Sequence, residues 1–223
     1  MSYTLCLFDL DGTLTDPRVG ITKSFQYALT AFGINEELDN LTRCIGPPLR
    51  ESFREFYGFS LTDTEKAVAR YREYFAETGI FENEVYPGIP KTLQRLRDNE
   101  KTLAVATSKV TVYTQMILKR FGLDGFFSFV SGDEMDGSLT NNGKRDIIRI
   151  ALNQLDPEGK MRPVMIGDRK HDVNGARDVG IDSIGVTWGY GSRAELEEAS
   201  ATIIVESIDE LCHLLIVDGS NEV

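Results

Sequence analysis

The fold of this chain is decided by the stretch Thr4-Leu-Cys-Leu-Phe-Asp9-Leu-Asp11-Gly12, which stands near the start of its 223 residues. The first part of the stretch is a short apolar run, and such a run is typical of a buried strand. Asp9 and Asp11 interrupt the run, and the Asp-Gly pair indicates a turn. We therefore expect a buried strand that presents two carboxylates at its end.

Residues 16–83 are predicted to form a block of helices inserted after this strand. Apolar side chains recur at helical spacing in 21–32, 49–56 and 62–77, and the block contains no convincing strand pattern. The aromatic residues of these stripes are expected to form the core of the block rather than a stacking surface for a ligand: Phe25, Phe32, Phe53 and Phe56.

From residue 84 on, helical stripes alternate with short apolar runs. The expected strands are 103–106, 126–130, 164–166, 183–187 and 202–205. Such alternation favours a parallel sheet with helices on both faces. The predicted fold class is therefore α/β. A Rossmann-like parallel sheet core, formed by residues 1–15 and 84–223, carries the helical block 16–83 as an inserted domain.

The composition narrows the classes of partner and compartment. The 24 Lys and Arg residues and 35 Asp and Glu residues give a net charge of −11, which argues against nucleic acid or an anionic membrane as the main partner. The global charge does not exclude a local site for a small anion. The three cysteines form no Cys-x-x-Cys pair, and no apolar run approaches the ~20 residues of a membrane span. Because no basic leader precedes the first aspartates, we expect a soluble, cytoplasmic protein.

Polar residues that could take part in catalysis or ligand binding lie where the predicted strands end or where the next helix begins. They are Asp9, Asp11, Ser108, Lys109, Lys144, Asp168 and Asp172. In an open parallel sheet, ligands bind beyond the carboxyl ends of the strands, so these groups are expected to share one crevice. Clustered carboxylates repel each other unless a cation lies among them, and an oxygen-only ligand set suits Mg²⁺. With the metal bound, the crevice would accept a phosphate dianion.

The same residues, in this order, resemble the haloacid dehalogenase superfamily of phosphotransferases over about residues 4–216. The run from Asp9 to Thr15, Asp-Leu-Asp-Gly-Thr-Leu-Thr, is similar to motif I of that superfamily. Ser108 is similar to motif II, Lys144 to motif III, and Gly167-Asp168 with Asp172 to motif IV. The helical block looks like the C1 cap of these proteins.

The resemblance implies a Mg²⁺-dependent phosphomonoester hydrolase. Asp9 would be the nucleophile that forms an aspartyl phosphate, and Asp11 would be the general acid and base. Ser108 and Lys144 would complete the catalytic set. The metal would be held by Asp9, Asp11 (through its main-chain carbonyl), Asp168 and Asp172.

The substrate is the least determined part of this interpretation. Ile45-Gly-Pro-Pro-Leu-Arg50 is similar to a cap segment of phosphoglycolate phosphatase-like and some 5′-nucleotidase-like members of the superfamily. The resemblance therefore favours a small phosphorylated metabolite, phosphoglycolate or a nucleoside 5′-monophosphate. Ser108, Lys109, Lys144 and Arg50 are the candidate substrate-binding residues, and the protein is expected to be a monomer or a homodimer.

Two other functions remain open at this stage. A phosphomutase of the β-phosphoglucomutase kind has the same two aspartates and a similar cap. A non-catalytic protein that binds phosphorylated ligands on the same fold belongs to a different class altogether.

Two of these residues and one further segment also have a purely structural interpretation. Asp172 could serve as a cap of the following helix and have no other role, and Arg50 could be a surface residue at a helix start. The segment Gly189-Tyr190-Gly191-Ser192 follows a strand but lacks the full dinucleotide-binding fingerprint, so we predict that it is a loop.

Overall fold

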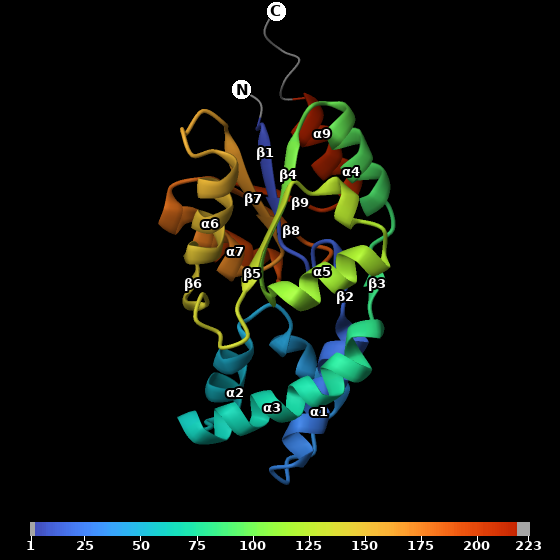
Figure 1. Ribbon diagram of the computed structural model, residues 1–223, viewed down its shortest axis with the longest axis vertical. Helices are drawn as coiled ribbons and strands as arrows, with labels where there is room; N and C mark the ends of the chain where they lie inside the picture. The colour runs from blue at the N-terminus through green and yellow to red at the C-terminus, as the bar shows by residue number, and fades with distance from the viewer. Residues whose placement is uncertain (1–2, 218–223) are drawn as a thin grey trace, which may run out of the picture.

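The computed structural model describes residues 3–217. A parallel sheet carries helices on both faces, and a block of helices lies beyond one end of the sheet (Figure 1). None of the helices in residues 3–217 combines the length and apolar character that a membrane crossing requires.

The central sheet has six strands in the order β5-β4-β1-β7-β8-β9, and every neighbouring pair is parallel. The strands are β1 (Leu5–Phe8), β4 (Thr102–Val110), β5 (Phe129–Asp133), β7 (Pro163–Gly167), β8 (Asp182–Val186) and β9 (Ile203–Val205). Counted along the chain, this order is 3-2-1-4-5-6, that of the doubly wound α/β fold. The α/β fold class predicted from the sequence is confirmed.

The register of the sheet sets the ends of β1 and β7 within one residue of each other. Phe8, the last residue of β1, pairs with Val105 of β4 on one side and with Ile166 of β7 on the other. The strand order reverses at β1, so the segments that follow β1 and β7 diverge at this point and leave a crevice. The residues after Phe8 and Ile166 therefore face the same space.

Alternate side chains of β1 enter two separate apolar layers. Leu5 and Leu7 pack on one face with residues of α6 and α7, whereas Cys6 and Phe8 pack on the other with residues of α4, α5 and α9. The helices of the sheet region are α4 (Ile89–Asp98), α5 (Thr111–Arg120), α6 (Arg145–Leu155), α7 (Lys170–Val179), α8 (Arg193–Glu198) and α9 (Ile208–Val217). A parallel sheet covered on both faces needs strands that are apolar throughout, as β1 is.

The helical block comprises α1 (Arg18–Thr30), η1 (Leu38–Cys44), α2 (Leu49–Tyr57), α3 (Leu61–Glu77) and η2 (Gly79–Phe81), where η marks a 3₁₀ helix. The two chain segments that join it to the sheet region pair as a short antiparallel ribbon of β2 (Thr15–Asp16) and β3 (Glu84–Val85). This ribbon was not predicted from the sequence, because a two-residue strand is too short to show an apolar periodicity.

Two other elements also differ from expectation. The strand predicted at 126–130 begins only at Phe129, because Asp124–Phe126 forms the 3₁₀ turn η3 and Phe126 still packs against the apolar core. A further short strand, β6 (Asn141–Lys144), precedes α6. Lys144 thus lies at the junction of a strand and a helix, where the backbone is fixed from both sides.

The core of the helical block is built on Phe53. Its side chain is 0% exposed, and its ring centroid lies 4.8 Å from that of Phe25 and 5.9 Å from that of Phe59. Phe56, which we expected in the same core, is 36% exposed. The two residues are three positions apart, which is less than a full helical turn, so their side chains point in different directions. The Arg43 guanidinium covers the Phe56 ring.

Phe53→Ala should lower the free energy of unfolding by about 3–5 kcal/mol, because it removes a buried ring and leaves a cavity beside Phe25 and Phe59. Phe56→Ala, on the same helix, should lower it by less than about 1 kcal/mol. Urea denaturation followed by far-ultraviolet circular dichroism measures both values. Equal losses for the two variants would contradict the packing described for Phe53.

Candidate active site

Three carboxylates meet in the crevice at the ends of β1 and β7. Asp9 directly follows β1, Asp168 directly follows β7, and Asp172 lies in the first turn of α7. One oxygen of each carboxylate lies within 4.8 Å of an oxygen of the other two. The three residues are 4%, 0% and 1% exposed, respectively, so bulk water does not screen their charges.

A single buried ammonium group opposes this negative charge. Lys144 Nζ lies 2.8 Å from Asp9 Oδ1 and donates a hydrogen bond to Asp172 Oδ1. Burial alone would lower the pKa of Lys144, but Asp172 and Asp9 outweigh burial and hold the pKa above its ordinary value. Lys144 is therefore positively charged and compensates part of the cluster.

Asp168 is the least compensated of the three. Its Oδ2 accepts a hydrogen bond of 2.7 Å from the Tyr190 N–H, whereas its Oδ1 is buried and accepts none from any residue between 3 and 217. Burial raises the pKa of Asp168 well above its ordinary value, and the charges of Asp172 and Asp9 raise it further. An orphaned carboxylate oxygen among excess negative charge is a site that suits a hard cation, so the donor set fits Mg²⁺.

The two interpretations of Asp172 turn out to be compatible. Its Oδ2 accepts a hydrogen bond of 3.0 Å from the Arg169 N–H, which caps the start of α7. Its Oδ1 faces Lys144 in the cluster. One carboxylate therefore fixes the helix and contributes charge to the site.

Asp11 belongs to a second, neighbouring pair. Its Oδ2 accepts a hydrogen bond of 2.6 Å from Lys109 Nζ, and its carboxylate is not part of the cluster of three. Burial raises the pKa of Asp11, and Lys109 offsets only part of that increase. The carboxyl group thus holds its proton to a higher pH than a free aspartate, which is the property a general acid needs.

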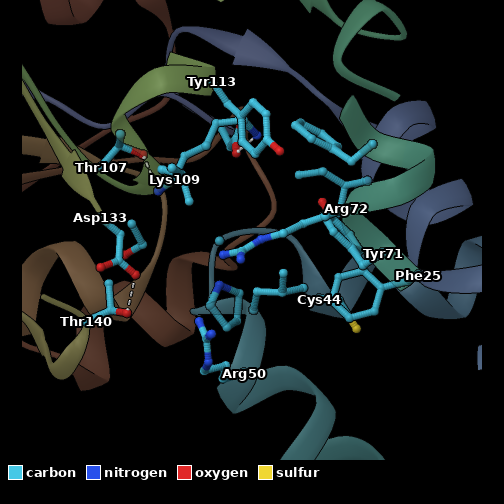
Figure 2. Close-up of a pocket in the computed structure, with 18 of the residues that line it drawn as sticks. Phe25, Cys44, Arg50, Tyr71, Arg72, Thr107, Lys109, Tyr113, Asp133 and Thr140 are labelled. Carbon is cyan, nitrogen blue, oxygen red and sulfur yellow. Dashed lines mark hydrogen bonds and ion pairs between the residues drawn. The ribbon is translucent and has the colours of Figure 1, made fainter. Parts of the chain in front are cut away.

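A cavity of about 90 Å³ lies between the sheet and the helical block, beside Asp9 and Asp11 (Figure 2). Thr107 and Lys109 line it from the core, and Phe25 and Tyr71 line it from the block. The hydroxyl oxygen of Ser108, which also lines the cavity, is buried and has no hydrogen-bond partner within the described chain. A buried, unpaired hydroxyl beside a cavity is positioned to bind a ligand.

The candidate residues predicted from sequence thus lie in or beside one cavity. Asp9, Asp11, Ser108 and Lys109 line the cavity, and the carboxylates and Lys144 adjoin it. Arg50 also lines the cavity, but its guanidinium forms a two-point ion pair with Glu65, with distances of 2.7 and 2.9 Å.

The loop after β8 has a positional role that the sequence analysis missed. A Cβ atom on Gly189 or Gly191 would collide with Asp168, as would one on Gly12, whose φ of +84° is also unfavourable for other residues. Gly12 and Gly189 leave the space in which the Asp168 carboxylate is buried, and Gly191 leaves room for the Asp168 backbone carbonyl. The Gly-x-Gly spacing after a strand was the signal in the sequence that could have indicated this role. The glycines are needed because Asp168 occupies the adjacent space, and not because they bind a nucleotide.

Arg169 is a second residue that sequence reasoning missed. It is buried next to Asp168, its Nε donates a hydrogen bond of 2.9 Å to Glu195, and its NH1 donates one to the Ile45 carbonyl oxygen. A Cβ atom on Gly46 would lie 2.6 Å from Arg169 Cγ. This contact joins the active-site loop of the core to the segment that leads into α2.

Comparison with known proteins identifies the family. Residues 6–186 match the haloacid dehalogenase-like hydrolase family, so the chain belongs to this family. The 5′-nucleotidase of Pseudomonas aeruginosa is 45% identical over 205 residues, which span 91% of this chain and 90% of that protein. With relatives of this kind, the chain is a phosphatase.

Two further relatives cover almost the whole chain. The tyrosine-protein kinase PtkA of Mycobacterium tuberculosis is 40% identical over 213 residues, which span 94% of this chain and 72% of that protein. The crystal structure of a predicted phosphatase from Clostridium acetobutylicum superposes with a TM-score of 0.90 at 45% identity. The superposition covers 95% of this chain and 97% of that one.

The raised pKa of Asp168 leads to a prediction for the metal-free protein. A carboxyl group whose pKa is higher in the folded state stabilises the fold when protonated, and this contribution is lost as pH rises from about 4 through the folded-state pKa. In EDTA at pH 7, Asp168→Asn should therefore raise the free energy of unfolding, by about 1–3 kcal/mol, because it removes a buried carboxyl group whose ionisation the fold disfavours.

The measurement is urea denaturation of wild type and variant in EDTA between pH 4 and pH 8. The gain from Asp168→Asn should disappear toward pH 4, where the wild-type carboxyl group is protonated. Asp178→Asn, on the exposed side of α7, should leave the profile unchanged. A loss of stability on Asp168→Asn at pH 7 would contradict the charge balance described here.

Proposed function

We propose that this phosphatase hydrolyses a small organophosphate with Mg²⁺ as its cofactor and through an aspartyl phosphate on Asp9. The observation that carries the proposal is the cluster of three buried carboxylates, with Lys144 as its ion-pair partner, beside a cavity. Such a cluster is costly without a cation, and a cation next to Asp9 would let a carboxylate approach a phosphate dianion.

The metal would be held by the carboxylates of Asp9, Asp168 and Asp172 and by the main-chain carbonyl of Asp11. When bound, it would neutralise charge on the phosphoryl oxygens and offset their repulsion from the nucleophile. The orphaned Oδ1 of Asp168 is a donor atom that accepts no hydrogen bond from the described residues. Lys144 would continue to neutralise Asp172 and to orient Asp9.

The first chemical step would be carried by Asp9 and Asp11. A carboxylate oxygen of Asp9 forms a bond to phosphorus while the bond from phosphorus to the ester oxygen breaks. Asp11 gives its proton to the departing oxygen, and its raised pKa supports this role. The Ser108 hydroxyl donates a hydrogen bond to a phosphoryl oxygen, which would give this buried hydroxyl the hydrogen-bond partner that it lacks.

The second step returns the enzyme to its starting form. Asp11, now a carboxylate paired with Lys109, takes a proton from a water molecule as the water oxygen attacks phosphorus. The bond between phosphorus and Asp9 breaks, and inorganic phosphate leaves. Lys109 holds Asp11 at 2.6 Å, so the same carboxyl group is positioned for both proton transfers.

Two observations bear on the kind of substrate. The name of the Pseudomonas aeruginosa relative supports a nucleoside 5′-monophosphate. The cavity of about 90 Å³ supports a smaller leaving group, such as that of phosphoglycolate, because pockets for drug-sized ligands are several times larger. Both candidates are phosphomonoesters and share the mechanism above.

The mechanism predicts a burst for Asp11→Asn with p-nitrophenyl phosphate. The p-nitrophenolate group departs without needing a proton, so the first step persists, whereas hydrolysis of the aspartyl phosphate loses its base. The variant should release about one equivalent of p-nitrophenolate per chain and then turn over about 10²–10⁴-fold more slowly than wild type. Stopped-flow absorbance in the presence of Mg²⁺ measures both phases.

The controls separate the parts of the proposal. Asp9→Asn should give no burst, and wild type in EDTA should release no inorganic phosphate. With Mg²⁺ and no other acceptor, wild type should release inorganic phosphate continuously, which distinguishes hydrolysis from transfer to a sugar phosphate or to a protein hydroxyl. Rapid steady turnover by Asp11→Asn, or a burst from Asp9→Asn, would contradict the assigned roles.

A further inference from the structure

Arg72 places a positive charge inside the cavity. It lies on α3, is half-buried and lines the cavity. Its side chain reaches from the helix into the middle of the space between the block and the core (Figure 2). Within residues 3–217, no hydrogen-bond or ion-pair partner of its guanidinium is found.

The other two cations that line the cavity are already engaged. Lys109 pairs with Asp11 at 2.6 Å, and Arg50 forms its two-point ion pair with Glu65. Among the lining residues of the described chain, Arg72 is thus the cation without a partner. Arg50 was predicted from sequence as a substrate-binding residue, but the geometry favours Arg72 for an anionic part of the substrate.

Asp133, the acidic residue across the cavity, is not free to pair with Arg72. Its Oδ1 accepts hydrogen bonds of 2.8 Å from the Glu134 N–H and 3.1 Å from the Leu139 N–H. Its Oδ2 accepts one of 2.6 Å from the Thr140 hydroxyl. These bonds fix the loop after β5 and satisfy the carboxylate locally.

The surroundings of Arg72 disfavour its charge. Burial lowers the pKa of Arg72, and the positive charge of Arg50 lowers it further. The aromatic side chains of Phe25, Tyr71 and Phe75 line the same cavity and exclude water from part of it. A guanidinium in such a place becomes more favourable when an anion binds to it, because a charge-assisted hydrogen bond is strong where water is scarce.

We propose that Arg72 binds a carboxylate on the leaving group of the substrate, so that the enzyme selects small phosphomonoesters of hydroxycarboxylic acids, such as 2-phosphoglycolate. This inference rests on the proposed function, because it places the phosphoryl group at Asp9 and the rest of the molecule in the cavity. One unpaired cation matches the single charge of a carboxylate better than the double charge of a second phosphate. A nucleoside is a neutral leaving group and leaves Arg72 without a partner.

The test compares two phosphonates that differ only in this charge. In 3-phosphonopropionate, a methylene group replaces the ester oxygen of 2-phosphoglycolate, and 3-phosphonopropionamide is its uncharged counterpart. Neither ligand can be hydrolysed, so calorimetric titration in the presence of Mg²⁺ measures binding whether or not the chain has phosphatase activity. A failure of the proposed function would be seen separately, as absent release of inorganic phosphate.

Wild type should bind the carboxylate ligand about 10–100-fold more tightly than the amide, the range expected for a charge-assisted hydrogen bond. Arg72→Gln should reduce this preference to less than about 3-fold, and Arg72→Lys should restore part of it. Arg70→Gln is the matched control, since Arg70 lies two residues away on the same helix and pairs with Glu73. Its preference should equal that of wild type.

Several results would overturn the proposal. They are equal binding of the two ligands by wild type, no binding of 3-phosphonopropionate, and a preference that survives in Arg72→Gln. A nucleoside 5′-phosphonate that binds wild type more tightly than 3-phosphonopropionate would also overturn it, in favour of a nucleotide substrate.

Discussion

The structure depends on the imbalance between three buried carboxylates and one buried ammonium group. Asp9, Asp168 and Asp172 lie within a few ångströms of one another, and Lys144 compensates only part of their charge. Much of the surrounding structure makes this arrangement possible. The register of β1 and β7 brings the ends of these two strands together, and the glycine-rich loop after β8 leaves the volume for Asp168.

Several cations gather around the cavity although the chain has a net charge of −11. Four cations lie in or beside the cavity: Lys144, Lys109, Arg50 and Arg72. The acidic residues there form ion pairs or hydrogen bonds, or belong to the proposed cation site. An overall acidic protein can therefore bind a small dianion, since the interaction is decided within a few ångströms where screening is weak. The helical block contributes the apolar walls and the free guanidinium, and Arg169 ties its connecting segment to the core.

The parts of the site that could be predicted from sequence are those that lie next to strand ends. Asp9, Ser108 and Asp168 each follow an apolar run, and the geometry of a parallel sheet brings such positions together. Lys144 was predicted through its place in a series of motifs. The parallel sheet with helices on both faces was predicted from alternation alone, whereas its strand order, the start of β5 and the ribbon of β2 and β3 were not.

The remaining residues could not be predicted because their roles arise only when distant segments pack. Arg72 and Arg50 both look like ordinary helix arginines, and only the position of Glu65 decides which of them is free. Gly189 and Gly191 matter because of the volume of Asp168, which lies more than twenty residues earlier. Phe53 and Phe56 differ in burial although both fit the same apolar stripe.

The central claim is that the carboxylate cluster is a cation site, and calorimetric titration of Mg²⁺ into the metal-free protein tests it most directly. We predict one bound ion per chain, with an affinity that falls at least about 10-fold in Asp168→Asn and is unchanged in Asp178→Asn. Absence of saturable Mg²⁺ binding by wild type, or equal affinity in wild type and Asp168→Asn, would contradict the claim.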